Sequence, residues 1–577
     1  ARSAILRIRS RSISDGGNAT ISTTGLLSSK IRTLTLPSAN IELRSGHWSL
    51  YGSTSIVGTT NTIGRENSTY FLNSSNVYVE QADNHQHSNN YQATLGIGYD
   101  FTPKDILTLE AYYHRRNQDT DGKTGIIMST GVIENSFQNK DNGNKDQLML
   151  NTTIDYLHQW KTGKLTIVGS FVMNDNHENN DMHRYDSEQL WHVTTQNATA
   201  RHHEELYADI EQQLPGTWGQ IQGGLLSSTW VNREETKNVM IQNGLTIPYS
   251  TFNEFFKYKE QYYAGYCSWK YDNNAFSASV GLRYEFRILD PQQELQTTDN
   301  SRSRYSHLFP SIQLGYEFNR SHGHRLDISY SQSATIPHMR MLNPAIHWES
   351  QYTYSTGNPH LQPAYGYELM STLTVWHNFR LTASMNHNSE FENIFLNKEG
   401  SDVYYSTYVN GEETNDYYLS LSGNKMINRK FIVNASSGYC YSHRNYQGME
   451  ITDNSLNAHL STIAMLPANL RLTLSGLCYS KKNWLTMKMA ERWQASANLN
   501  WQTAKNRLSI SLGYIYVPRC NIKICTPGVE VNSLSLAPLD RFTLSLRYNL
   551  TWGHRGIKVQ HSSSVSSEGR RGAISTD

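Results

Sequence analysis

The 577-residue chain has no long apolar run and few hydrophobic residues overall. A helix needs about 20 mainly apolar residues to cross a bilayer, so the sequence excludes helical membrane spans. Hydrophobic residues make up only 37% of the chain, too few for a large soluble core. Disorder does not explain the deficit, because 36 Tyr, 12 Trp and 16 Phe exceed what a solvated coil carries. A membrane β-barrel reconciles these facts, since only one face of each strand must be apolar.

The chain also lacks an excess of charge of one sign. Lys and Arg number 51 against 50 Asp and Glu, which gives no electrostatic reason to expect nucleic acid as a partner. A Walker loop, a metalloprotease helix and a nucleophile elbow are all missing, so we expect neither catalytic residues nor a cofactor. Metal ligands are the less favoured interpretation of the histidines, which we expect to be solvated loop residues because no carboxylate or cysteine spacing fixes a site. These histidines are His85, His87, His177, His183, His192, His202 and His203.

Cysteine is scarce as well, with five in the chain. Cys267, Cys440 and Cys478 fall within strand patterns, where they serve as small strand residues. Cys520 and Cys525 flank a short segment and could form a disulfide, which suits an oxidising compartment. Two free thiols remain the alternative.

What the chain does have is strict alternation of apolar and polar residues. In residues 276–286 one face carries Arg283 and Glu285, and the same alternation recurs in 91–101, 508–516 and 541–548. Aromatic residues stand at the ends of the apolar stripes, where a bilayer places its interfacial girdles. We therefore expect the apolar face to contact lipid. In the first segment this face comprises Phe276, Ala278, Val280, Leu282, Tyr284 and Phe286.

Short and long connections alternate along the chain, with about ten tight turns and about eleven longer linkers. Residues 58–89, 116–145 and 175–200 are among the expected long linkers. The pattern predicts an all-β transmembrane antiparallel barrel of about 22 strands, with short periplasmic turns and long extracellular loops. A lumen of that width needs a plug. A soluble propeller or sandwich array would explain the alternation but not the asymmetry of the connections.

A proline-rich segment interrupts the strand pattern at residues 330–363. Its ordered elements resemble a signature of TonB-dependent outer-membrane receptors, especially the Bacteroidetes-type outer-membrane β-barrel family. Residues 3–12 look like the last strand of such a plug domain, and 540–552 like the closing barrel strand. The elements of the segment are Tyr330-Ser331, Pro337, Leu342-Asn343-Pro344 and Gly357-Asn358-Pro359-His360-Leu361-Gln362-Pro363.

The resemblance implies a division of the chain into three parts. Residues 1–16 would be the remnant of the plug-domain end, 17–552 the transmembrane barrel and 553–577 a polar tail. The chain starts without Met or an apolar signal region, so we expect it to be cut from a longer precursor whose plug is encoded upstream.

The same segment predicts an ordered loop on physical grounds. Prolines fix φ and remove amide donors, so Pro337, Pro344, Pro359 and Pro363 should stop strand propagation. Asn343 and Asn358 precede prolines, which biases them to extended or turn geometry. An ordered outer loop of this kind can act as a lid or as a platform for a ligand.

Aromatic residues in this loop are the candidate ligand-binding residues. His347, Trp348, Tyr352 and Tyr354 belong to it, and Trp191 lies in another long linker. Aromatic faces offer contact area for sugars, aromatic ligands or peptides. The alternative is that these rings pack the loop or belong to the upper aromatic girdle.

The resemblance implies that the protein is an outer-membrane receptor or transporter barrel for the uptake of a scarce ligand. Its partners would be outer-membrane lipid, the TonB energy-transducing complex acting through the plug, and a small ligand, glycan or peptide. The resemblance leaves open a surface lipoprotein as a further partner. A non-transporting structural or adhesive barrel that displays surface loops is the alternative. A soluble β-rich glycan-binding module is a third interpretation.

Overall fold

The computed structural model describes most of the chain between Gly16 and Gly553. The predicted plug remnant and the predicted polar tail lie outside the described residues, apart from these two glycines. Within 16–553 the gaps are 29–30, 73, 75, 131–133, 186–189, 243–244, 249–253, 274, 294–301, 351–352, 390, 399–402, 412, 447–448, 485, 504–506, 519–520, 527–528 and 536–539.

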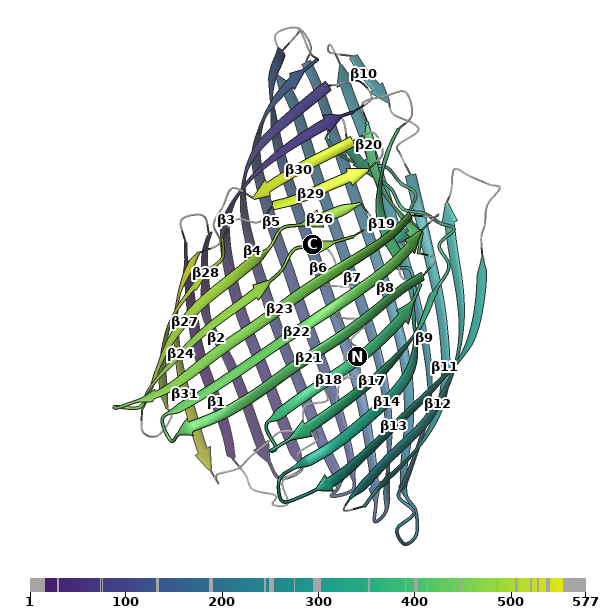
Figure 1. The fold of residues 1–577 in the computed structure, drawn as a ribbon, viewed down its shortest axis with the longest axis vertical. Coiled ribbons are helices and arrows are strands. Elements are labelled where there is room, and N and C mark those ends of the chain that lie inside the picture. Colours follow the sequence, from purple (N-terminus) through teal and green to yellow (C-terminus); the bar gives the residue numbers. More distant parts are fainter. Residues whose placement is uncertain are drawn as a thin grey trace.

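A ring of 22 antiparallel strands forms a closed barrel, because the last strand pairs back onto the first (Figure 1). Closure leaves no free sheet edge within the bilayer. The ring strands are β1 (Gly16–Leu27), β2 (Ile31–Ser45), β3 (Trp48–Phe71), β4 (Asn76–Thr102), β5 (Asp105–Ser129), β6 (Glu134–Trp160), β7 (Gly163–Tyr185), β8 (Leu190–Gln213), β9 (Gln220–Gln242), β11 (Glu254–Asp272), β12 (Phe276–Gln293), β13 (Ser303–Asn319), β14 (His324–Thr335), β17 (Ala364–Val375), β18 (Phe379–Asn388), β21 (Glu413–Asn428), β22 (Phe431–Tyr446), β23 (Met449–Leu466), β24 (Leu470–Tyr479), β27 (Arg492–Gln502), β28 (Leu508–Tyr516) and β31 (Arg541–Gly553).

The predicted strand number and the alternation of turns are confirmed, but several outer linkers are not loops. Strands β3 to β9 are 23 to 27 residues long, whereas a membrane strand needs about 9–11 residues. The expected linker 58–89 is a continuous hairpin in which Ile63 pairs with Asn84. Polar residues predominate on both faces in the middle of these long strands, as in residues 80–90 of β4, so the apolar alternation ends although the backbone ladder continues.

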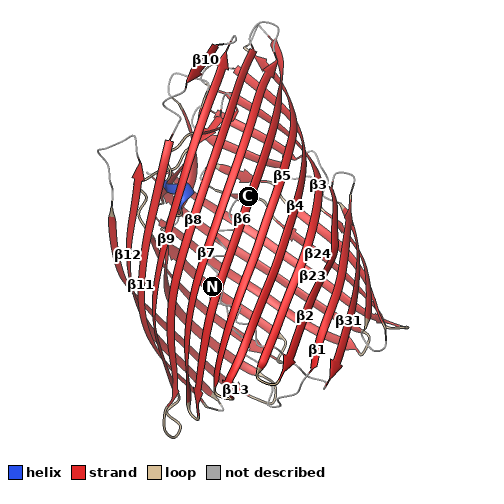
Figure 2. Ribbon diagram, turned by 180° about the vertical axis from the view of Figure 1, so that it is seen from behind, coloured by secondary structure: helices blue, strands red, loops and turns tan. Residues whose placement is uncertain are grey.

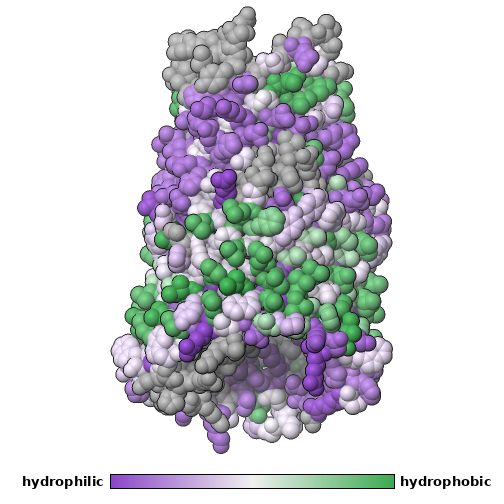
Figure 3. Space-filling model, turned by 90° about the vertical axis from the view of Figure 1, so that its left-hand side faces the viewer, coloured by the Kyte–Doolittle hydropathy of each residue, from purple (hydrophilic) through white to green (hydrophobic). Residues whose placement is uncertain are grey.

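On the face drawn in Figure 3, apolar residues form a band across the lower half of the barrel, and the region above it is mainly polar apart from a smaller apolar patch near the top. Leu282 on β12 is 48% exposed and faces outward. The opposite face of the same strand is polar: Arg283 and Glu285 form an ion pair in which the Arg283 Nε lies 2.7 Å from Glu285 Oε1. The predicted sorting of the two faces is therefore confirmed on this strand.

Short strands from the remaining outer connections extend the wall. β30 (Val529–Ser535) pairs with the outer end of β3. β29 (Asn521–Thr526) joins β30 to β26 (Met487–Met489), and β25 (Lys482–Asn483) pairs with β26. β10 (Leu245–Pro248) forms a small hairpin with the end of β9. The outer strand segments around β3 are thereby hydrogen-bonded beyond the bilayer.

One helical turn occurs in the described residues, α1 (Met339–Leu342), drawn blue in Figure 2. Among the described helices, none is long and apolar enough to cross a membrane.

Candidate functional site

A second, four-stranded sheet lies at the outer mouth of the barrel. Its strands are β15 (His347–Ser350), β16 (Thr353–Ser355), β20 (Tyr404–Asn410) and β19 (Phe391–Asn397), in that order. β15 and β16 come from the connection between β14 and β17, whereas β19 and β20 come from the connection between β18 and β21. The two connections join through the parallel pairing of β16 with β20. We call these four strands the mouth sheet.

One end of the β19–β20 hairpin in the mouth sheet packs against the wall formed by β11 and β12. Phe256, Tyr258 and Leu289 project from the inner face of that wall, and they form an apolar cluster with Met339, Leu342 and Leu361 of the proline-rich loop. Phe391 of β19 and Tyr408 of β20 pack against the same cluster. The proline-rich loop is therefore anchored inside the barrel mouth.

The other end of the β19–β20 hairpin reaches a different part of the wall. Tyr404 of β20 joins a buried cluster with Phe71, Tyr78, Ile126 and the loop strand residues Val529 and Val531, and Phe395 of β19 packs against it. The ring centroids of Phe71 and Tyr404 are 6.4 Å apart. The β19–β20 hairpin thus bridges two walls of the mouth, which the sequence did not predict.

The proline-rich loop makes several hydrogen bonds within its own backbone. The Gly357 amide donates to the Asn343 carbonyl at 2.8 Å, and the Asn358 amide donates to the Met341 carbonyl at 2.6 Å. A Cβ at Gly357 would lie 2.4 Å from the Asn343 carbonyl oxygen, so only glycine allows this approach. Pro337 is fully buried beside this turn.

Side chains of the loop fasten it to its surroundings. Asn343 is 3% exposed, and its Nδ2 donates to Glu234 Oε2 on β9 at 3.1 Å. The Asn358 Nδ2 donates to the Tyr408 carbonyl at 3.0 Å. Asn410 of β20 accepts the Gln362 amide at 3.0 Å and donates back to the Gln362 carbonyl at 2.7 Å. Pro344 and Pro359 lie between these contacts, and Pro363 is buried.

The candidate ligand-binding residues are divided between described and undescribed positions. Tyr354 is 9% exposed and stacks on Tyr405 with ring centroids 5.0 Å apart and planes 3° from parallel. His347 lies half-buried in β15. Trp348 and Trp191 lie in described strands although their side chains are not described, and Tyr352 is outside the described residues. Tyr354 therefore packs the mouth sheet, while the roles of the others stay predictions.

A charged and aromatic cluster lines the inner wall below the mouth sheet. Arg287 bridges Glu260 at 2.6 Å and Glu285 at 3.4 Å, and its guanidinium lies 3.8 Å from the centre of the Tyr262 ring. Arg283 lies 5.1 Å from the centre of the Phe309 ring. Arg283 and Glu285 were expected as polar lumen wall, which is where they lie.

The sequence did not identify three residues of this cluster, Glu260, Tyr262 and Arg287, as candidate site residues. The sequence did contain a signal for them. Charged and aromatic residues recur at the inward positions of the two paired strands, 254–272 and 276–293. Such a cluster can bind polar groups and aromatic or sugar rings.

Buried polar groups also occur away from this cluster. His203, expected to be a solvated loop residue, was predicted wrongly. It is 1% exposed on the inner wall, stacks on Trp230 at 3.7 Å between ring centroids and is hydrogen-bonded to Ser228 at 3.0 Å. Its position on a continuous long strand explains the error.

In the outer part of β6, burial and the nearby Glu80 carboxylate raise the pKa of Asp141 to about 6. This carboxyl accepts a hydrogen bond from Thr124 at 3.3 Å, which acts in the opposite direction on the pKa.

The described residues form no metal site, and the predicted disulfide stays untested. Within the described ranges, no three His, Cys, Asp or Glu side chains converge as metal ligands. Cys525 lies in β29, whereas Cys520 falls outside the described residues, so their pairing stays a prediction.

The sequence matches the outer membrane protein beta-barrel family over residues 158–515, more than half of the chain. The chain therefore belongs to this family, and its place is the outer membrane. A comparison with curated protein sequences gives no significant match.

Solved structures with a similar fold include three bacterial proteins. The siderophore receptor PiuA from Acinetobacter baumannii matches with a TM-score of 0.60 at 11% identity, over 93% of this chain and 82% of that one. The siderophore receptor PirA from Pseudomonas aeruginosa matches with a TM-score of 0.55 at 12% identity, over 94% and 81%. FpvA of P. aeruginosa, bound to a heterologous pyoverdine, matches with a TM-score of 0.58 at 12% identity, over 93% and 72%. At these identities the likeness concerns the fold.

Proposed function

We propose that this member of the outer membrane protein beta-barrel family is a TonB-dependent receptor that imports a scarce ligand across the outer membrane. The observation that carries the proposal is the ordered mouth sheet, anchored on two walls of a closed 22-strand barrel. A barrel that serves only as a scaffold has no need of such a cover. Several structurally similar proteins are siderophore receptors, and one was solved with a ferric pyoverdine, which makes an iron chelate the first ligand to test.

The ligand would meet the mouth before it meets the lumen. His347, Trp348, Tyr352 and Trp191 are the proposed capture residues, with Tyr354 holding the mouth sheet through its stack on Tyr405. The cluster around Arg287 would contact the ligand next, because it lies on the inner wall below the anchored loop. No bond is made or broken in this scheme, in keeping with the absence of catalytic motifs from the sequence.

Energy for release would come from the TonB complex, acting through a plug. Residues 1–16 are proposed to be the end of that plug, 17–552 the barrel and 553–577 a tail. A surface lipoprotein that assists capture at the mouth is a further proposed partner.

The test is uptake in the native host. Radiolabelled ferric siderophores are supplied to the wild type, to a strain lacking this gene and to a strain lacking TonB function. The proposal expects uptake of at least one ligand to be lost in both deletions, with binding to cells retained when only TonB is missing. Growth on candidate glycans and peptides extends the test to other ligands.

An adhesive or structural barrel gives a different result, with surface binding that is independent of TonB and no uptake of any ligand. An upstream reading frame without a plug would also contradict the proposal.

A further inference from the structure

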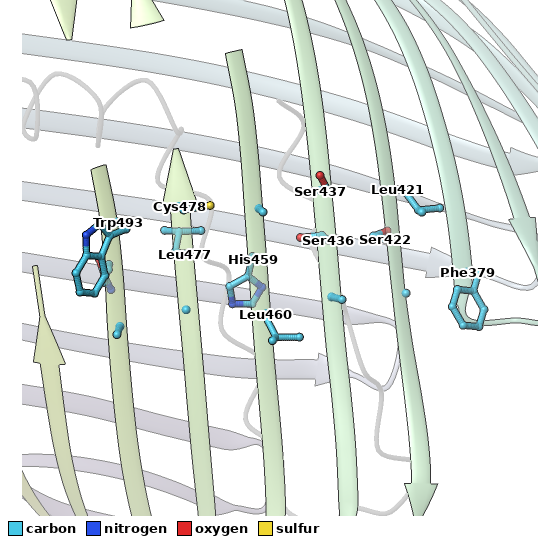
Figure 4. A pocket seen from close by; sticks show the side chains of 16 residues that line it. Phe379, Leu421, Ser422, Ser436, Ser437, His459, Leu460, Leu477, Cys478 and Trp493 are labelled. Carbon is cyan, nitrogen blue, oxygen red and sulfur yellow. The ribbon is translucent and has the colours of Figure 1, made fainter. Parts of the chain in front are cut away.

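A groove of about 620 Å³ lies in the wall formed by β18, β21, β22, β23, β24 and β27. Large apolar side chains bound it, with Trp493 at one side and Phe379 at the other (Figure 4). Leu460 is 55% exposed and Trp493 is 48% exposed, which places the lining on the lipid-facing side of the wall. The groove is distinct from the mouth and from the lumen, and the inference below does not rest on the proposed import function.

Strand register explains why a groove forms here. Gly423, Ala435, Leu460, Gly476 and Ala495 are successive partners across five strands and share the outward face. The next outward row contains Ser437, Ala458 and Cys478, which lead to Trp493. The outward side chains on these adjacent strands are small. They do not fill the space between the larger side chains around them, so a groove remains in the outer surface of the wall.

The floor of the groove is open at its centre. A Cβ added at Gly476 would meet no atom within 4 Å. At Gly423 the Phe379 ring already covers the corresponding position, with its nearest atom 2.6 Å away. The groove is therefore closed at the Phe379 end and unfilled beside Gly476.

The periplasmic end of the same wall is basic. Lys425 lies on the outward face two residues beyond Gly423, and Arg429 and Lys430 follow at the turn between β21 and β22. All three are exposed, and residues 419–437 and 458–477 contain no Asp or Glu. Exposed Trp376 at the adjacent turn, with 60% of its surface free, has the character of an interfacial anchor. The basic residues thus lie at headgroup level, next to the apolar groove.

We propose that this wall binds an anionic glycerophospholipid of the periplasmic leaflet. One acyl chain occupies the unfilled part of the groove beside Gly476, and the phosphate contacts Lys425, Arg429 and Lys430. Clustered basic residues at a membrane surface attract anionic headgroups, and a flexible chain can enter a groove that small residues leave open. A second copy of the barrel fits less well. A stable protein interface needs about 800 Å² on each partner, and the outer wall of a barrel is convex and cannot enter this groove.

The experiment measures lipid retention by the purified full chain. Barrels are reconstituted in nanodiscs of phosphatidylcholine that contain about 10–20% phosphatidylglycerol, so that the two lipids compete for the protein. The barrels are then released into mild detergent for native mass spectrometry. The groove variant is Gly476→Leu, and its matched control is Gly169→Leu. Gly169 of β7 also has no atom within 4 Å of an added Cβ and lies on the outward face between Ile167 and Phe171.

The headgroup variant replaces Lys425, Arg429 and Lys430 with Gln, and its control replaces Lys104 and Lys161. Both control lysines are exposed in other turns of the periplasmic rim. Each variant counts as folded if the unheated sample migrates faster on a denaturing gel than the heated sample.

We expect the wild type and both controls to retain phosphatidylglycerol over phosphatidylcholine by about tenfold relative to the lipid supplied, corresponding to a difference near 1.4 kcal/mol. Gly476→Leu and the triple Gln variant should each reduce that preference at least severalfold. Equal retention of the two lipids by the wild type overturns the proposal. So does an unchanged preference in folded Gly476→Leu, or a wild-type dimer that this substitution dissociates.

Discussion

Replacing Leu282 with Arg tests the assignment of the two barrel faces. Leu282 stands in the middle of the outward stripe of β12, between Cys267 on β11 and Pro310 on β13. Nearly half of its surface is free of protein contact, so lipid covers it in the membrane. A guanidinium placed there costs about 2–4 kcal/mol at mid-bilayer depth, which corresponds to a decrease of about 30- to 700-fold in the folding equilibrium constant.

The matched control is Ser279→Arg, three residues earlier on the opposite face. Ser279 pairs with Lys270 and Gln313 on the lumen side, where water can solvate an added charge. We expect that change to stay within about 1 kcal/mol, as at other solvated surface positions.

The assay is equilibrium urea unfolding of barrels inserted in lipid vesicles, followed by tryptophan fluorescence and by heat-modified mobility on gels. Destabilisation of the Leu282 variant alone supports the assignment. Equal losses for the two variants, or a larger loss for Ser279→Arg, would show that the facing of β12 has been inferred incorrectly.

Three further predictions concern the loop and the outer wall. Gly357→Ala should destabilise the proline-rich loop by about 1–3 kcal/mol, because its Cβ collides with backbone carbonyl oxygens, and limited proteolysis within 336–363 should become faster. Asn343→Ala should loosen the same loop by about 1–3 kcal/mol, since Glu234 loses a buried donor; unchanged cleavage would show that this contact is not needed. Asp141→Asn should raise the melting temperature more at pH 7 than at pH 4.5. The folded pKa of Asp141 is raised, so its destabilising ionisation develops as pH rises from the unfolded value toward about 6, and a constant difference across this range would contradict the reasoning.

The mouth sheet changes how the proline-rich signature is understood. The prolines and Gly357 end the barrel strand and turn the chain inward, and Asn343 and Asn358 then fasten it to β9 and β20. The loop is therefore part of the cover over the mouth. The apolar loop residues Met339, Leu342 and Leu361 are buried against the inner wall, so a ligand would contact neighbouring side chains instead.

Local patterns in the sequence determined the barrel itself. The alternation through residues 276–286 assigns the lipid and lumen faces, because a strand has a period of two wherever one side meets lipid. Prolines and asparagines determined where the loop after β14 would be ordered, because they restrict φ and ψ at their own positions. These patterns are properties of short segments, so they can be recognised without knowing which other segments pack against them.

Only the tertiary structure decided what lies beyond the membrane and across strands. The outer halves of β3 to β9 are mainly polar on both faces, apart from apolar residues near their tips such as Phe71, Tyr78 and Ile126. No regular alternation marks them as strands, and only the backbone pairing with neighbours reveals them. The parallel pairing of Tyr354 with Tyr405 joins two connections far apart in the chain. The lipid-facing groove likewise requires the register of five strands, since Gly423 and Gly476 become part of one surface only when their rows align. Each depends on contacts between distant segments, which local periodicity does not encode.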